Sequence, residues 1–134
     1  MKISSRNVVE GTARTPHRAI YKAMGLTDDD LSKSFIGVCH TGNEATPCNI
    51  HLPELAIGAK DGVEDGGATP REFSTIAVCD GIAMGLEGLT SSLVSRETIA
   101  ASIAWLLRAH QYDALVCRAG CNKSLTTTMK GIVT

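Results

Sequence analysis

Three short apolar runs, separated by two longer stretches with helical spacing, constrain the fold of this chain most strongly. The runs cover residues 34–39, 72–78 and 113–117, and each has the length of a buried strand. Between them, apolar residues recur every three or four positions over 52–63 and again over 99–107, as in helices. Alternation of this kind implies right-handed crossovers and a parallel sheet. The sequence therefore predicts an α/β fold, a three-layer α/β/α domain with a parallel central sheet.

The segments outside these runs carry recognisable start and stop signals. Residues 1–14 are polar and are expected to form an arm on the surface. Thr15 is expected to cap a helix that Gly25 ends, and Thr27, followed by three aspartates, to cap a second, short helix. Ser95 is expected to cap the later long helix.

Composition excludes several classes of function. The chain has 134 residues, enough for one core, and a formal net charge of −1 without a block of lysine or arginine. These properties favour neither nucleic acid nor an anionic membrane as a partner. No apolar run has membrane-spanning length, and the polar first residues lack the core of a secretory signal. We therefore expect a soluble, cytoplasmic protein.

The five cysteines fall into two groups. Their odd number, wide spacing and lack of a C-x-x-C pair argue against a disulfide framework and a zinc knuckle. Cys39, Cys79 and Cys117 lie in or at the ends of predicted strands, where a buried free thiol is the expected state. Cys48 and Cys121 differ, because both lie in loops beyond strand ends.

The loops that follow the three predicted strands carry most of the reactive groups. Cys48 lies in the first loop, Asp80 in the second, and Cys121, Asn122 and Lys123 follow one another in the third. Because parallel strands end at one edge of a sheet, where open α/β sheets bind ligands, we expect the three loops to converge. Thiolates suit iron–sulfur clusters, and a carboxylate suits a hard cation such as magnesium. The sequence predicts a soft site beside a hard one.

Each of these residues also has an ordinary structural explanation. His40, Glu44 and His51 flank or lie in the first loop and could ligate metal, but histidines near a helix start more often cap or pack. Asp80 and the glycine after it could form a plain turn. Residues 121–123 could be a buried cysteine, a turn asparagine and a solvated lysine.

Several segments resemble motifs of the dihydroxy-acid dehydratase family. They are 43–52 (NEATPCNIHL), 73–85 (FSTIAVCDGIAMG) with 95–97 (SRE) after it, and 120–123 (GCNK), which is similar to a Gly-Cys-Asp-Lys turn of the family. The resemblance runs from about residue 6 to residue 125. Sugar-acid dehydratases share the architecture, but TPCNIHL and DGIAMG favour the enzyme of branched-chain amino-acid synthesis.

The resemblance implies cofactors and a reaction. Cys48 and Cys121 would be ligands of an iron–sulfur cluster, and Asp80, Asn122 and carbamylated Lys123 would bind Mg²⁺. The implied activity is that of a hydro-lyase that converts 2,3-dihydroxy acids to 2-oxo acids in valine, leucine and isoleucine synthesis. The family's full-length members are expected to be homodimers.

The chain departs from the family pattern in three ways. Asn122 replaces an aspartate, residues 126–129 stand where the family has Pro-Gly-Met, and 130–134 have no evident counterpart. Family members are longer, and their third cluster cysteine and serine base come later. We therefore expect 1–134 to be an incomplete amino-terminal iron–sulfur and magnesium domain, with no catalytic residue of its own and inactive alone. The alternatives are a truncated, non-catalytic binding or interaction domain and a sugar-acid dehydratase relative.

Overall fold

A parallel sheet of three strands forms the centre of the molecule. The structure is a computed structural model that describes residues 3–133, apart from the side chains of Asn122, Lys123, Ile132 and Val133. The strands, in sheet order, are β2 (Thr69–Ser74), β1 (Phe35–His40) and β3 (Ala114–Arg118). Both pairings are parallel, as the sequence predicts.

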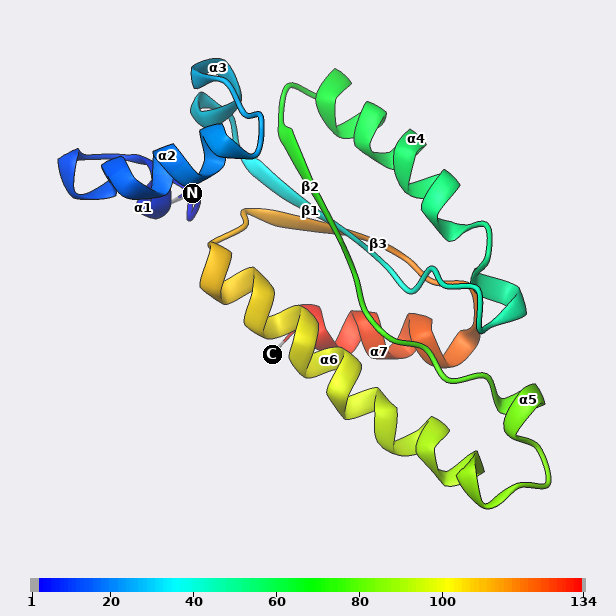
Figure 1. The fold of residues 1–134 in the computed structure, drawn as a ribbon. Coiled ribbons are helices and arrows are strands. Elements are labelled where there is room, and N and C mark those ends of the chain that lie inside the picture. Colours follow the sequence, from blue (N-terminus) through cyan, green and yellow to red (C-terminus); the bar gives the residue numbers. More distant parts are fainter. Residues whose placement is uncertain (1–2, 134) are drawn as a thin grey trace.

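Helices cover both faces of this sheet (Figure 1). Helix α4 (Leu52–Asp65) lies on one face, and α6 (Ser91–His110) and α7 (Asn122–Val133) lie together on the other. The core between the sheet and α6 is built on buried Cys39, Ile99 and Ile103. The predicted three-layer α/β/α architecture is therefore confirmed. No helix in the described part of the chain combines the length and apolar character needed to cross a membrane.

The prediction of a surface arm over residues 1–14 is only partly right for the described residues 3–14, since residues 10–14 are exposed but Ser5 and Val9 are buried. This segment contains α1 (Arg6–Val9) and the 3₁₀ helix η1 (Thr12–Arg14), and it packs against α2 (Thr15–Ala23) and α3 (Asp28–Ser32). Val9 is only 5% exposed and joins a core cluster with Leu26, Leu31 and Phe35. A helix of four residues is too short to give a periodic apolar signal, so the sequence did not reveal it.

The predicted helix caps in this region are partly right. Thr27 forms a reciprocal capping box with Asp30, and Gly25 adopts a positive φ of 91° just after α2, as expected at a helix end. Thr15, however, is the first residue of α2 rather than its cap, and its hydroxyl donates a hydrogen bond to the Thr12 carbonyl at 2.7 Å.

The second strand begins and ends earlier than the predicted 72–78. Pairing with β1 runs from Phe35 with Thr69 to His40 with Ser74, and the Thr75 N–H donates one further bond to the His40 carbonyl at 3.0 Å. Since β1 ends at His40, the next residues have no strand to pair with, and Ile76 is 54% exposed. The apolar run at 76–78 therefore lies in a connection, not in the sheet.

The long helix also begins earlier than predicted. The 3₁₀ helix η3 (Glu87–Thr90) leads directly into α6 at Ser91. Ser95 is therefore inside the helix instead of capping it, and its hydroxyl bonds back to the Ser92 carbonyl at 3.2 Å. A serine hydroxyl can make its hydrogen bond within a helix in this way, so a serine before an apolar stripe does not identify the start of a helix.

The carboxylate of Asp113 joins three segments at the amino edge of the sheet. It accepts hydrogen bonds from the backbone N–H of Ser5 at 2.9 Å and of Phe35 at 3.0 Å. The Asp113 N–H in turn donates to the Phe35 carbonyl at 2.8 Å. The amino-terminal segment, β1 and β3 are thereby held in one register.

Glu72 on β2 should make stability depend on pH. Its carboxylate pairs with Lys60 at 2.5 Å and with His40 Nε2 at 3.1 Å. The Lys60 ammonium group, followed by His40, holds the pKa of the Glu72 carboxyl below its ordinary value, against an opposing effect of burial. The ionised Glu72 carboxylate therefore contributes to the stability of the fold above the ordinary carboxyl pKa. This stabilisation is lost as pH falls through the lowered pKa of the folded state.

We therefore expect Glu72→Gln to lower the free energy of unfolding at neutral pH by less than about 1 kcal/mol, since the pair is partly solvated. The deficit should vanish as pH falls into the acid range. Urea denaturation from neutral to acid pH measures this deficit, with Asp61→Asn, at an exposed position in the middle of α4, as the control. A deficit that stays constant with pH would contradict this account of Glu72.

Candidate functional site

The loops after the three strands meet at the carboxyl edge of the sheet (Figure 1). Strand β1 leads to the 3₁₀ helix η2 (Pro47–Asn49), which carries Cys48. Strand β2 leads to α5 (Asp80–Ala83), and β3 leads through Cys121 into α7. The predicted convergence of these loops is confirmed.

Two cysteines far apart in the sequence are neighbours at this edge. The thiols of Cys48 and Cys121 are within hydrogen-bonding reach of each other, and Cys121 Sγ lies 3.3 Å from Ser124 Oγ. Burial raises the pKa of the Cys48 thiol, and the nearby thiol groups of Cys121 and Cys79 raise it further. The edge therefore presents a pair of partly buried thiols.

Gly120 allows the two cysteines to approach. A Cβ atom at Gly120 would lie 2.8 Å from the carbonyl carbon of Cys48 and would overlap its oxygen and Asn49 Oδ1. The φ of Gly120 is not positive, so the requirement is for space and not for a special backbone conformation. Gly120 is thus needed where the β3 connection crosses η2.

Polar atoms buried at this edge fit the binding of a further group. Among the residues that the structure describes, the Asn49 amide nitrogen and oxygen and the Thr41 hydroxyl find no hydrogen-bond partner, although both residues are fully buried. Such atoms are rare inside folded chains and call for a bound ion, ligand or water. Two thiols beside a free amide suit a bound group that the cysteine sulfurs can ligate and that can accept hydrogen bonds from the amide.

The other candidate ligands of the first loop are accounted for differently. His40 is buried and uses both ring nitrogens, since Nδ1 accepts from the Gly42 N–H at 2.9 Å and Nε2 meets Glu72. It is a packing residue. His51 is exposed at the start of α4, and Glu44 is exposed in a turn. Within the described residues, no three histidine, cysteine, aspartate or glutamate side chains form a group that could hold a metal ion.

The predicted magnesium ligands are only partly described. Asp80 is the first residue of α5 and is partly buried. Asn122 and Lys123 begin the backbone of α7, but their side chains lie outside the described part of the structure. Their ligand roles remain predictions.

Cys79 is a thiol of this edge that sequence reasoning missed. It lies just before α5, partly buried, and its proximity helps to raise the pKa of Cys48. The misplaced end of the second strand hid it, although its position next to Asp80 was a usable signal. Cys39 and Cys117, by contrast, lie opposite each other in the sheet, where their hydrogen bond and burial raise the pKa of Cys39.

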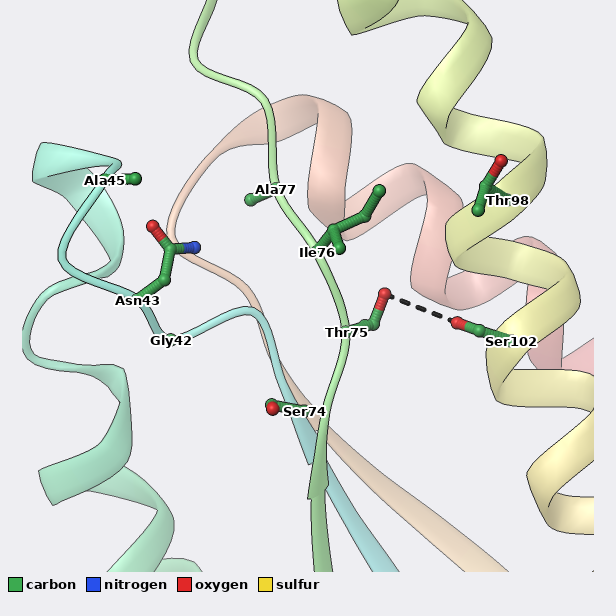
Figure 2. A pocket seen from close by; sticks show the side chains of 9 residues that line it. All are labelled: Gly42, Asn43, Ala45, Ser74, Thr75, Ile76, Ala77, Thr98 and Ser102. Atoms are coloured by element: carbon green, nitrogen blue, oxygen red, sulfur yellow. Dashed lines mark hydrogen bonds between the residues drawn. The ribbon is translucent and has the colours of Figure 1, made fainter.

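A groove opens between the loops and α6, as Figure 2 shows. It has a volume of about 480 Å³ and is lined by residues that follow β1, residues at and after the end of β2, and residues of α6. Ser102 on α6 donates a hydrogen bond to Thr75 Oγ1 at 3.3 Å across it. Its lining contains no thiol, carboxylate or imidazole. The thiol pair, not this groove, is therefore the better candidate for metal chemistry.

Comparison with known proteins identifies the family. Residues 33–134 match the sequence model described as dihydroxy-acid/6-phosphogluconate dehydratase N-terminal. The chain belongs to this family. Because the match extends to residue 134, the expectation that 130–134 have no counterpart is wrong. Despite the altered 126–129, the chain forms the continuous helix α7, which begins at Asn122 within the Gly-Cys-Asn-Lys segment.

Several similar curated relatives are named dihydroxy-acid dehydratase. The chain is 54% identical over 132 residues to the dihydroxy-acid dehydratase of Pelagibacter ubique and 53% identical to dihydroxy-acid dehydratase 2 of Bradyrhizobium diazoefficiens. It is 50% identical over 123 residues to the dihydroxy-acid dehydratase of Sulfurisphaera tokodaii. These matches cover 98%, 98% and 92% of this chain but only 23%, 23% and 22% of the relatives. The chain thus spans less than a quarter of the relatives' length, and their name supports the dihydroxy-acid prediction over the alternatives.

The close approach at Gly120 gives a direct prediction. Gly120→Ala should destabilise the fold by about 1–3 kcal/mol, because the added methyl group meets backbone that cannot move away easily. It should also separate the thiols, so that dibromobimane no longer cross-links Cys48 to Cys121, as read by peptide mass spectrometry. Gly58→Ala is the matched control, since its Cβ would meet nothing within 4 Å. Full cross-linking in Gly120→Ala would contradict this role.

Proposed function

We propose that the chain is the amino-terminal part of a dihydroxy-acid dehydratase. Such an enzyme removes water from 2,3-dihydroxy acids to give 2-oxo acids, here for branched-chain amino-acid synthesis. The observation that carries the proposal is the pair of neighbouring thiols, Cys48 and Cys121, at the carboxyl edge of the sheet. It occurs in a chain about half identical to proteins named for this reaction.

In this proposal Cys48 and Cys121 hold an iron–sulfur cluster. When bound, the cluster would supply an iron with an open coordination position, a Lewis acid for the departing 3-hydroxyl group. The chain brings the thiols together through η2 and the turn at Gly120, and buries them in part. With only two cysteine ligands assigned here, the iron should be labile in air.

The hard-cation site is proposed next to the thiols. Asp80 would contribute a carboxylate, and Lys123 would become an anionic oxygen ligand once carbamylated. Asn122 would contribute a neutral amide oxygen, which adds less charge than the aspartate of the family motif. Mg²⁺ at this site would bind the carboxylate and 2-hydroxyl oxygens of the substrate.

These residues would bind the cluster and Mg²⁺ and so orient the substrate. None of them is assigned as the base that removes the C2 proton. We therefore propose that the 134 residues alone are inactive. We place the protein in the cytoplasm, with a small dihydroxy acid as its partner and neither nucleic acid nor membrane. Exposed apolar side chains on α5, just after it and on α6, such as Ile82, Met84 and Val94, support assembly of the full-length enzyme into a homodimer.

A chimera tests the function directly. Residues of this chain replace the matching segment of the Pelagibacter ubique dihydroxy-acid dehydratase, and dehydration of 2,3-dihydroxyisovalerate is measured. We expect the chimera to be active, and Cys48→Ser and Cys121→Ser each to abolish activity and iron content together. Cys79→Ser, a thiol of the same edge without an assigned ligand role, is the control. An active, iron-loaded Cys48→Ser chimera would refute the proposed cluster site.

Position 122 should limit magnesium binding in the same chimera. Asn122→Asp adds an anionic oxygen, and the bound cation should then stabilise the carbamate at Lys123. We expect the apparent magnesium affinity to rise by about tenfold, or roughly 1.4 kcal/mol, with higher turnover. The measurement is the dehydration rate at a series of magnesium concentrations. If neither quantity changes, residue 122 is not a ligand.

A further inference from the structure

Asn49 is the most completely buried polar side chain beside the thiol pair. It directly follows Cys48 in η2 and is 0% exposed. Its backbone is satisfied, because the Asn49 N–H donates to the Thr46 carbonyl at 2.9 Å. Its side chain is not, since within the described residues neither amide atom has a hydrogen-bond partner.

The Asn49 amide lies where the Cys48 segment meets the segment that leads to Cys121. Its Oδ1 occupies the space that a side chain at Gly120 would need, so the amide packs against the residue just before Cys121. A half-turn of the amide exchanges its oxygen and nitrogen, so its N–H groups can face either way. An apolar side chain would fill the same volume without burying unused donors, so packing alone does not explain an asparagine here.

We propose that the Asn49 amide donates a hydrogen bond to a sulfur atom of the cluster held by Cys48 and Cys121. The inference rests on the proposed function, and it makes Asn49 a positioning residue that tunes the cluster. Hydrogen bonds to cluster sulfurs stabilise the more negative, reduced state and so raise the reduction potential. Loss of the donor should therefore shift the midpoint potential downward.

The test uses the chimera described above, in which this chain replaces the matching segment of the Pelagibacter ubique enzyme. It is reconstituted anaerobically with ferrous iron and sulfide, and a redox titration is then monitored by visible absorption. The unchanged chimera is compared with Asn49→Leu, which keeps the volume without donors, with Asn49→Ala, and with Asn49→Ser, which keeps a hydroxyl donor. Asn7→Ala is the control, because Asn7 bonds to Gln111 away from this edge. Thermal unfolding by circular dichroism shows whether each variant is folded.

We expect Asn49→Leu and Asn49→Ala to load iron and sulfide but titrate at a lower midpoint potential, with Asn49→Ser closer to the unchanged chimera. Loss of the cluster from folded Leu and Ala variants, with retention in Asn49→Ser, also supports the donor role. Equal potentials in all variants would overturn it, as would unfolding or cluster loss in all three. No cluster in the unchanged chimera would instead overturn the proposed function itself.

Discussion

The site depends on one close approach between two backbone segments. Gly120, at the end of the β3 connection, lies against the Cys48 carbonyl and the Asn49 side chain, where no Cβ atom fits. Because Cys121 follows Gly120, this contact brings the two thiol-bearing segments together. Every role proposed for the edge, from cluster binding to the hydrogen bond of Asn49, requires that contact.

Strand β3 is fixed at both ends, and the two ends serve different purposes. At the amino edge, Asp113 bonds to the backbone of Ser5 and Phe35 and secures the register of the fold. At the carboxyl edge, the chain turns at Gly120 beside buried polar groups of the first loop. Among the described residues, the buried Asn49 amide and Thr41 hydroxyl there have no hydrogen-bond partner. Such groups destabilise a fold, but they can bind a ligand.

The sequence predicted the parts of this arrangement that follow from periodicity and topology. Three apolar runs gave a parallel sheet, and the sheet placed Cys48 and Cys121 at one edge, as the structure confirms. It did not predict the bounds of β2, because pairing with β1 and not apolar character decides where that strand ends. Asn49 could not be predicted at all, since its burial against Gly120 arises only when two distant loops meet. The ligand roles of Asp80, Asn122 and Lys123 stay predictions.

Cysteine protection on cluster loading tests the central claim most directly. The chain is alkylated anaerobically before and after loading with iron and sulfide, and each cysteine is quantified by mass spectrometry. Cys48 and Cys121 should become protected together, whereas Cys79 should stay reactive and the buried Cys39 should react slowly in both states. Iron uptake that leaves Cys48 and Cys121 as reactive as before would contradict the account.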